Sequence, residues 1–137
     1  MSNENLETIV MHKIENLKIW QKSIELNKRV YQLVSELPND EKFGMISQIK
    51  RSSISIASNI AEGAGRNTNN EFYHFLGIAN GSSYELHTQL ILCQELNLIH
   101  KNKLNDILEQ CIEIQKMIYG FQISLKNSKN SFLKTQN

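Results

Sequence analysis

Apolar residues recur every three or four positions along four stretches of the chain, and polar residues fill the positions between them. This spacing matches the 3.6 residues of an α-helical turn, whereas no stretch shows the strict alternation typical of a half-buried β-strand. The stretches cover approximately residues 17–37, 41–64, 68–93 and 103–125. The pattern therefore predicts an all-α protein with four helices.

Capping and breaking residues mark the ends of these helices. Pro38, the only proline, ends the first helix because it lacks a backbone N–H and disfavours helical geometry in the residue before it. Asp40 is the expected N-cap of the second helix, and Thr68 and Glu71 form a capping box at the start of the third. Because short connections favour antiparallel neighbours, we expect an antiparallel up-down-up-down four-helix bundle.

Glycines have two expected roles in this bundle. Gly63 and Gly65 are expected to end the second helix through a left-handed backbone conformation. Gly77 and Gly81 lie inside the third helix, where each costs about 1 kcal/mol relative to alanine. We therefore expect a neighbouring helix to approach closely at Gly77 and Gly81. The expected neighbour is a strip of small residues on the second helix, formed by Ser53, Ala57 and Ala61.

The apolar positions that face inward predict a common core. Its expected centre consists of six residues from three helices, namely Ile56, Ile60, Leu86, Leu90, Ile114 and Ile118. A lone bundle needs about three apolar positions per heptad in each helix. The first helix has more, with Ile19, Trp20 and Tyr31 in excess, so part of its face is expected to contact another subunit.

The chain has 137 residues, which fits one domain. We expect a flexible N-terminal segment at 1–14, the bundle domain at 15–126 and a basic, polar C-terminal tail at 127–137. The formal net charge is only +1, but residues 67–100 contain three glutamates and no lysine or arginine. Residues 101–137 contain six lysines and three acidic residues. This asymmetry predicts one face or end that is more positive than the rest, although the simpler alternative is a set of solvated charges.

Targeting signals and reactive cysteines are not evident. The N-terminus lacks the basic start and apolar run of a secretion signal, and no stretch approaches the roughly 20 apolar residues that span a bilayer. We therefore expect a cytoplasmic protein with no membrane contact. Cys93 and Cys111 fit no metal or redox spacing, and both fall on apolar helical stripes.

Candidate catalytic and metal-binding motifs do not form a complete site. Glu71 and His74 make one Glu-x-x-His motif, but a di-iron bundle needs two copies and two further glutamates. Gly63-Ala-Gly65-Arg66 follows a helix, whereas phosphate-binding loops of this type follow a β-strand. We expect no enzymatic activity, no metal and no cofactor.

Asn59 and Glu62 are unusual because they lie in an otherwise small and apolar stretch. Arg66 is one turn from Glu62 and can pair with it in the same helix end, whereas Arg51 can meet an acid from another helix or subunit. These polar residues line either a contact between helices or subunits, or a contact with a nucleic acid or ligand. Both alternatives remain open at this point.

The run from Phe43 to Arg66, FGMISQIKRSSISIASNIAEGAGR, closely resembles the signature of the four-helix-bundle family of 23S rRNA-intervening sequence proteins. LKIW at 17–20, EFYHFL at 71–76 and IANGSSYEL at 78–86 add to the resemblance, which covers about residues 12–126. The resemblance implies homopentamers of antiparallel four-helix bundles. It extends distantly to the accessory variability determinant of diversity-generating retroelements, a basic pentamer that works with reverse transcriptase and nucleic acid.

Two departures from these relatives bear on nucleic-acid binding. Asn80 stands where many relatives have a basic residue, and the net charge is far less positive than that of the retroelement protein. Our leading hypothesis is a non-enzymatic, homo-oligomeric scaffold, by resemblance a pentamer, that contacts RNA or a nucleic-acid-bound protein. The alternative is a protein–protein interaction module with no nucleic-acid role.

The hypothesis assigns two sets of site residues. If a ring of subunits repeats a few basic residues, they form a positive band that contacts phosphates. The residues expected in that band are Lys22, Lys50, Arg51 and Arg66. The residues expected at subunit or helix contacts are Trp20, Asn59, Glu62, Gly77, Gly81 and Glu85. Alternatively, Arg51 and Arg66 pair with Glu62 or Glu85 between subunits.

Overall fold

The computed structural model describes residues 13–136, with side chains described for all of these except residues 42, 43 and 129–136. Four long helices form the body of the protein: α2 (Lys18–Val34), α3 (Ser47–Ala64), α4 (Asn69–Glu95) and α5 (Lys101–Gln136). Three short helical segments, η1 (Ile14–Asn16), η2 (Asn39–Glu41) and η3 (Lys42–Ile46), precede α2 and α3. The described residues include no strand, and the predicted all-α class is confirmed. Residues 1–12 of the expected N-terminal segment lie outside the described part.

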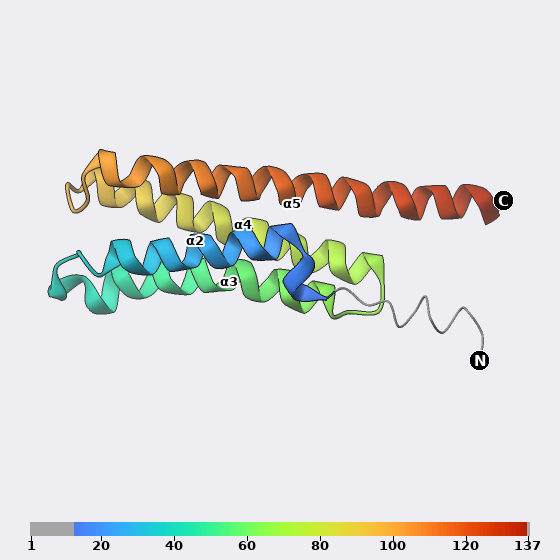
Figure 1. The fold of residues 1–137 in the computed structure, drawn as a ribbon, viewed down its shortest axis with the longest axis horizontal. Helices are drawn as coiled ribbons and strands as arrows, with labels where there is room; N and C mark the ends of the chain where they lie inside the picture. The colour runs from blue at the N-terminus through green and yellow to red at the C-terminus, as the bar shows by residue number, and fades with distance from the viewer. Residues whose placement is uncertain (1–12, 137) are drawn as a thin grey trace.

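The four helices pack side by side, and successive helices run in opposite directions (Figure 1). Extensive contacts join α2 to α3, α3 to α4, α4 to α5, and α5 back to α2. Each helix therefore neighbours the next one in the chain, and the last closes the bundle against the first. This is the up-down-up-down arrangement expected from short connections.

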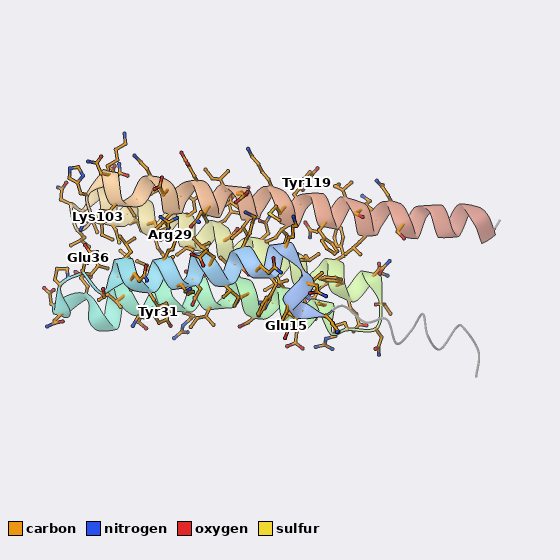
Figure 2. The ribbon with its side chains drawn as sticks, in the orientation of Figure 1. Glu15, Arg29, Tyr31, Glu36, Lys103 and Tyr119 are labelled. Atoms are coloured by element: carbon orange, nitrogen blue, oxygen red, sulfur yellow. The ribbon has the colours of Figure 1, made fainter. Side chains whose placement is uncertain are left out.

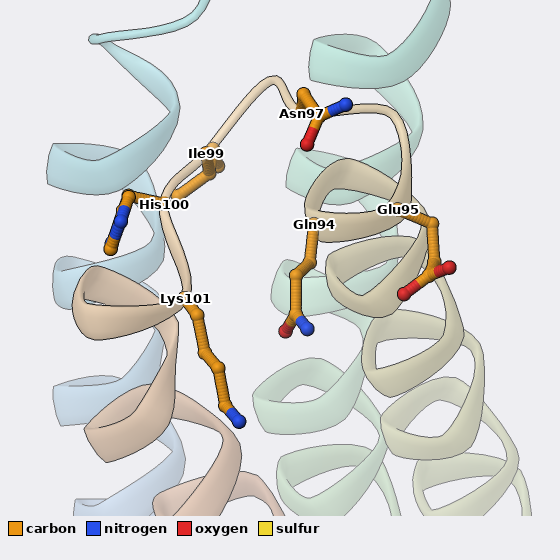
Figure 3. Close-up of a pocket in the computed structure, with 6 residues that line it drawn as sticks. All are labelled: Gln94, Glu95, Asn97, Ile99, His100 and Lys101. Atoms are coloured by element: carbon orange, nitrogen blue, oxygen red, sulfur yellow. The ribbon is translucent and has the colours of Figure 1, made fainter.

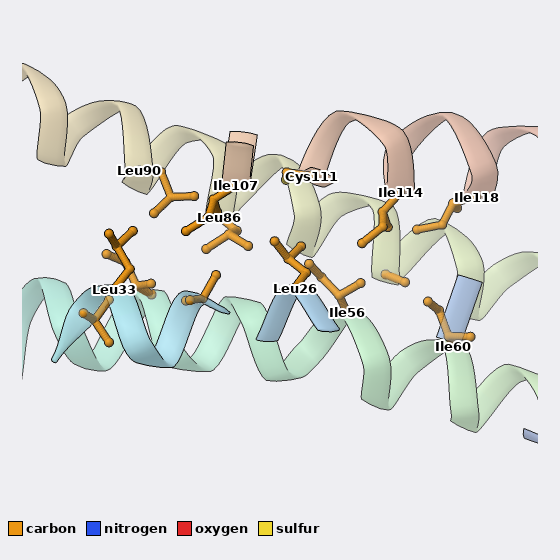
Figure 4. Packing of buried hydrophobic residues seen from close by; sticks show 14 of the residues in the cluster. Leu26, Leu33, Ile56, Ile60, Leu86, Leu90, Ile107, Cys111, Ile114 and Ile118 are labelled. Atoms are coloured by element: carbon orange, nitrogen blue, oxygen red, sulfur yellow. The ribbon is translucent and has the colours of Figure 1, made fainter. Parts of the chain in front are cut away.

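A single apolar core fills the space between the helices (Figure 4). All six residues predicted at its centre, from Ile56 to Ile118, are completely buried, so that prediction is confirmed. Leu26 and Val30 of α2 are also fully buried. Full burial of one such aliphatic side chain stabilises the fold by about 1.5–3 kcal/mol relative to exposure. The core therefore accounts for the packing of all four helices.

The connection between α2 and α3 differs from the prediction. Asp40 lies within η2 and does not cap α3, whose N-cap residue is Ile46, with no side-chain cap hydrogen bond. The backbone is already helical through η2 and the π-helix η3, so α3 begins in continuous helical backbone. A side-chain cap satisfies backbone donors that have no helical partner. An N-cap at Asp40 is therefore wrong for α3.

Close approach between α3 and α4 occurs at Gly63. A Cβ atom placed on Gly63 would lie 2.8 Å from Phe72 Cδ1 and 2.8 Å from Phe75 Cβ. No glycine in the described part of the chain has a positive φ, so the left-handed ending expected at Gly63 and Gly65 is wrong. Gly63 is required because α4 crosses the end of α3 too closely for a larger side chain. Thr68 then caps α4 as predicted, since its hydroxyl accepts a hydrogen bond from the Glu71 backbone N–H at 3.1 Å.

Gly77 and Gly81 do not face α3. Both are exposed. A Cβ on Gly77 would meet only Gln122 Nε2, at 3.5 Å, and a Cβ on Gly81 would meet nothing within 4 Å. The expected approach of the small-residue strip is therefore wrong, because hydrogen bonds from Ser52 to Gln89 and from Ser82 to Ser55 turn another side of α4 toward α3.

α5 runs much further than predicted. The apolar repeat suggested an end near Leu125, but the helix continues to Gln136 and projects beyond the other three (Figure 1). Residues 121–136 contain neither proline nor glycine, and their serine and asparagine disfavour a helix only weakly. By contrast, α4 ends at a tight turn before α5. In this turn Asn97 has a φ of 58°, and the Leu98 N–H donates a hydrogen bond to the Cys93 carbonyl oxygen at 2.8 Å.

Candidate functional site

Buried and half-buried polar side chains join the helices at three places beside the apolar core. In each place a serine hydroxyl on α3 bonds to a side chain of α2 or α4, which satisfies groups that would be costly to bury alone. These bonds also fix the height of one helix against the next. The pairs and their donor–acceptor distances are Asn27–Ser53 at 2.8 Å, Ser52–Gln89 at 2.7 Å and Ser82–Ser55 at 2.8 Å.

Asn59 belongs to this polar layer. Its Nδ2 donates to the backbone carbonyl and the hydroxyl of Ser55, each at 2.9 Å. The same Ser55 hydroxyl accepts from Ser82 of α4. Asn59 therefore supports the contact between α3 and α4 within one chain, as one of the predicted alternatives has it.

Arg66 is held by two carboxylates at the α3–α4 connection. Its guanidinium lies 3.0 Å from Glu62 and 3.7 Å from Glu71, and 4.8 Å from the centre of the Phe75 ring. The predicted pairing with Glu62 in the same helix end is thus observed. These contacts are exposed, so each ion pair stabilises the fold by about 1 kcal/mol or less. Arg66 and Glu62 act locally here, where the chain turns from α3 into α4.

The other three predicted nucleic-acid residues differ in their surroundings. Lys22 pairs with Glu113 of α5 at 3.2 Å. The Lys50 ammonium lies 4.8 Å from the centre of the Tyr31 ring, a cation–π distance. Arg51 is exposed, and no ion pair involves it within the described part of the chain. Of the four predicted basic residues, Lys50 and Arg51 therefore have no carboxylate partner among the described side chains, and they adjoin each other on α3.

The remaining predicted contact residues are split between core and surface. Trp20 is half-buried and packs against the core, whereas Glu85 is exposed and forms no ion pair with any described side chain. Ile19, which was also expected in excess on the first helix, is buried. Tyr31, the third residue expected in excess, is 36% exposed, and Ile24, seven residues before it, is exposed to the same extent.

A shallow pocket lies at the connection between α4 and α5 (Figure 3). Its lining is Gln94, Glu95, Asn97, Ile99, His100 and Lys101. Of these only Ile99 is buried, so the polar side chains around the pocket lie open to water. This pocket does not have the enclosed, convergent geometry of a catalytic site.

Metal ligands and reactive thiols do not form a site in the described part. No three His, Cys, Asp or Glu side chains come together there in a way that could hold a metal ion. Burial raises the pKa of the Cys111 thiol to about 12, although its hydrogen bond with Gln115 acts the other way. Burial, and then the charge of Glu41, also raise the pKa of Cys93. Both thiols are therefore protonated and weakly nucleophilic at neutral pH.

Six exposed apolar residues lie along the adjacent helices α4 and α5. We call this set the α4/α5 face. Tyr119, one of its members, lies on the opposite side of the bundle from Tyr31 (Figure 2). The spacing of seven between Tyr84 and Ile91 and between Ile112 and Tyr119 was its signal in the sequence. Its members are Tyr73, Tyr84, Ile91, Ile112, Tyr119 and Ile123.

None of the described helices is both long enough and apolar enough to cross a membrane. The exposed apolar residues alternate with polar ones, and they do not form a continuous apolar span.

Comparison with known proteins supports this fold. The family model described as 23S rRNA-intervening sequence protein matches residues 15–120. A crystal structure of a protein of unknown function from the S23 ribosomal protein family of Bacteroides thetaiotaomicron superposes with a TM-score of 0.71 at 30% sequence identity. That alignment covers 76% of this chain and 97% of the other. No curated protein matches the chain.

Proposed function

The chain belongs to the 23S rRNA-intervening sequence protein family, and we propose that it is a non-enzymatic helical scaffold that associates with copies of itself. The proposal is carried by one observation, the apolar character of α4 on its exposed side. Tyr73, Ile78, Tyr84, Ile91 and Leu92 are 37–58% exposed on this one helix. The opposite side of the same helix supplies eight buried residues.

A helix that is apolar all round is normally buried on all sides. α4 contains three glutamates and no lysine or arginine, so it also lacks the long basic side chains that commonly cover apolar surface. In the single chain about half of α4 faces water. We propose that another subunit covers this exposed half, and the family resemblance favours a ring of five subunits.

Substitution of Tyr84 tests this proposal. Tyr84 is 58% exposed, so Tyr84→Lys leaves the core intact but places a charge in the middle of the proposed contact. We expect the variant to lose association at micromolar concentration and to keep its helical circular dichroism. Gln32→Lys, on an exposed polar position of α2, is the matched control and should associate like the natural protein. Equal masses for the natural protein and both variants would contradict the role of α4.

A second proposal is that the assembled scaffold contacts RNA. The specific support is α5, because residues 114–137 contain four lysines and no acidic residue and most of this segment is helical. The described lysines in it, Lys116 and Lys126, are exposed and pair with no carboxylate of the described residues. A subunit ring would repeat these charges, and contacts with phosphates would then be independent of base sequence.

Salt dependence tests the RNA proposal. We expect binding of a generic RNA at about 50 mM salt that weakens at least tenfold at about 200 mM, because bound counterions are released. Lys116→Ala combined with Lys126→Ala should weaken binding. Lys22→Ala should not, since its charge is already paired with Glu113. If the assembled protein does not bind RNA at low salt, the RNA proposal is wrong and only the proposed self-association remains.

A further inference from the structure

Two exposed surfaces of this chain are complementary to each other. We propose that the α4/α5 face of one copy seats on the α2/α3 face of the next, in a head-to-tail contact that closes into a ring. The α2/α3 face consists of Ile24, Tyr31, Ile54, Lys50 and Arg51. This inference rests on the self-association proposed above and assigns the two surfaces that meet.

The α2/α3 face is apolar and basic. Ile24, Tyr31 and Ile54 are 36–45% exposed. The basic pair, Lys50 and Arg51, lies among them, with the Lys50 ammonium above the Tyr31 ring. α3 has only one acidic residue, at its far end, and that carboxylate pairs with Arg66. The charge of the basic pair is therefore not compensated within the described chain.

The α4/α5 face is apolar and acidic at the same end of the bundle. Glu95 of α4 and Glu109 of α5, which we call the acidic pair, are exposed and form no ion pair with described residues. Next to them, Ile91 and Ile112 are each 37% exposed. The surface thus offers apolar side chains with negative charge beside them.

Contacts between helices place the two charged pairs at similar heights along the bundle. Ser52, next to the basic pair, bonds Gln89, six residues before Glu95. Arg29, near Tyr31, pairs with Asp106, three residues before Glu109. An α-helix rises 1.5 Å per residue. Measured along the bundle axis, the basic pair therefore lies between Glu95 and Glu109 and within about 10 Å of each.

Equal height is what a ring requires. Rotation about an axis parallel to the helices moves a subunit sideways but keeps every group at its height, so surfaces at equal heights on two sides of the bundle can meet. The opposite positions of Tyr31 and Tyr119 show that the two faces lie on different sides (Figure 2). A contact between different surfaces is heterologous, and it forms a closed ring when the rotation closes. The occupant of each face is therefore a second copy of this chain.

Charge reversal tests the proposed contact. We expect Lys50→Glu with Arg51→Glu to lower the mass of the assembly toward that of a single chain, and Glu95→Lys with Glu109→Lys to do the same. An equimolar mixture of the two variants should regain a larger mass than either alone, because each then offers the charge that the other lacks. Lys22→Glu with Arg29→Glu is the matched control, since these residues pair with α5 of the same chain and should leave the mass unchanged.

Each other outcome contradicts this inference in a distinct way. If the basic-pair variant associates like the natural protein, the α4/α5 faces pair with each other or with another surface, and the head-to-tail contact is wrong. If both variants dissociate and mixing restores nothing, the charges do not face each other. A natural protein that is a single chain in solution would instead contradict the proposed self-association itself. Light scattering of the natural protein, the three variants and the mixture separates these cases.

Discussion

At the scale of single residues, Ile60 best represents the core. It is fully buried in the cluster that joins all four helices. We expect Ile60→Ala to lower the free energy of unfolding by about 2–5 kcal/mol, because it removes packed methylene groups and leaves a cavity. Ile60→Val should cost less, about 0.5–1.5 kcal/mol. Denaturant titration measures both, and a loss below about 0.5 kcal/mol for the alanine variant would place Ile60 on the surface.

Cys111 gives stability a predictable dependence on pH. Burial raises the pKa of its thiol from 9.0 to about 12, so the unfolded chain loses this proton at a lower pH than the folded chain does. Ionisation of Cys111 therefore does not change the free energy of unfolding below pH 9. Between pH 9 and about 12 that free energy falls as the pH rises, because the thiol of the unfolded chain loses its proton while the thiol of the folded chain keeps it. Cys111→Ala should flatten this decline.

The measurement is the free energy of unfolding at several pH values between 8 and 11. The alanine variant is less stable at every pH, because it also loses buried volume, so the comparison is between slopes and not between absolute values. Equal slopes for both proteins would show that Cys111 titrates normally in the fold.

Single-residue roles were the hardest to predict from sequence, and the glycines show why. The pattern identified Gly77 and Gly81 as packing residues, but their positions face outward, and Gly63 is the residue that Phe72 and Phe75 approach. The apolar repeat defines which stripe of a helix is buried. It does not define how far two helices are rotated against each other, and that rotation decides which glycine meets a neighbour.

At the scale of helices, the two kinds of glycine should respond oppositely to alanine. Gly63→Ala forces a Cβ into the Phe72 and Phe75 side chains and should destabilise the fold by about 1–3 kcal/mol. Gly81→Ala adds a Cβ that meets nothing within the chain and should stabilise α4 by up to about 1 kcal/mol.

Thermal or denaturant unfolding of the two variants provides the comparison. Stabilisation by Gly63→Ala would contradict the close crossing of α3 and α4. Loss of assembly mass in Gly81→Ala, with the helix content intact, would show that a second subunit packs against this glycine. Such a result would extend the proposed contact to the outermost side of α4.

The helices themselves were predictable, whereas several of their ends were not. Four apolar repeats predicted α2 to α5 and the buried residues at their centre, because burial imposes the 3.6-residue period directly on the sequence. The ends of α3 and α5 depend on backbone geometry that leaves a weaker mark. A π-helix leads into α3 without any capping residue, and nothing after Leu125 breaks α5.

At the scale of the whole molecule, the candidate site was only partly predictable. The sequence indicated which residues are charged, but pairing depends on which helices are neighbours. Lys22 meets Glu113 from 91 positions further along the chain, and Arg66 is taken up by Glu62 and Glu71. Two of the four basic residues that were expected to contact nucleic acid therefore form ion pairs within the chain. Lys50 and Arg51 remain, and they lie on one of the two faces proposed to meet.

Self-association through the exposed side of α4 underlies both the proposed function and the proposed ring. The most direct test is the mass of the natural protein by light scattering at micromolar concentration. One chain has a mass of 15.8 kDa, so five subunits would give about 79 kDa, and we expect a stable multiple of the single mass. A mass that remains near 15.8 kDa across this concentration range would contradict the claim.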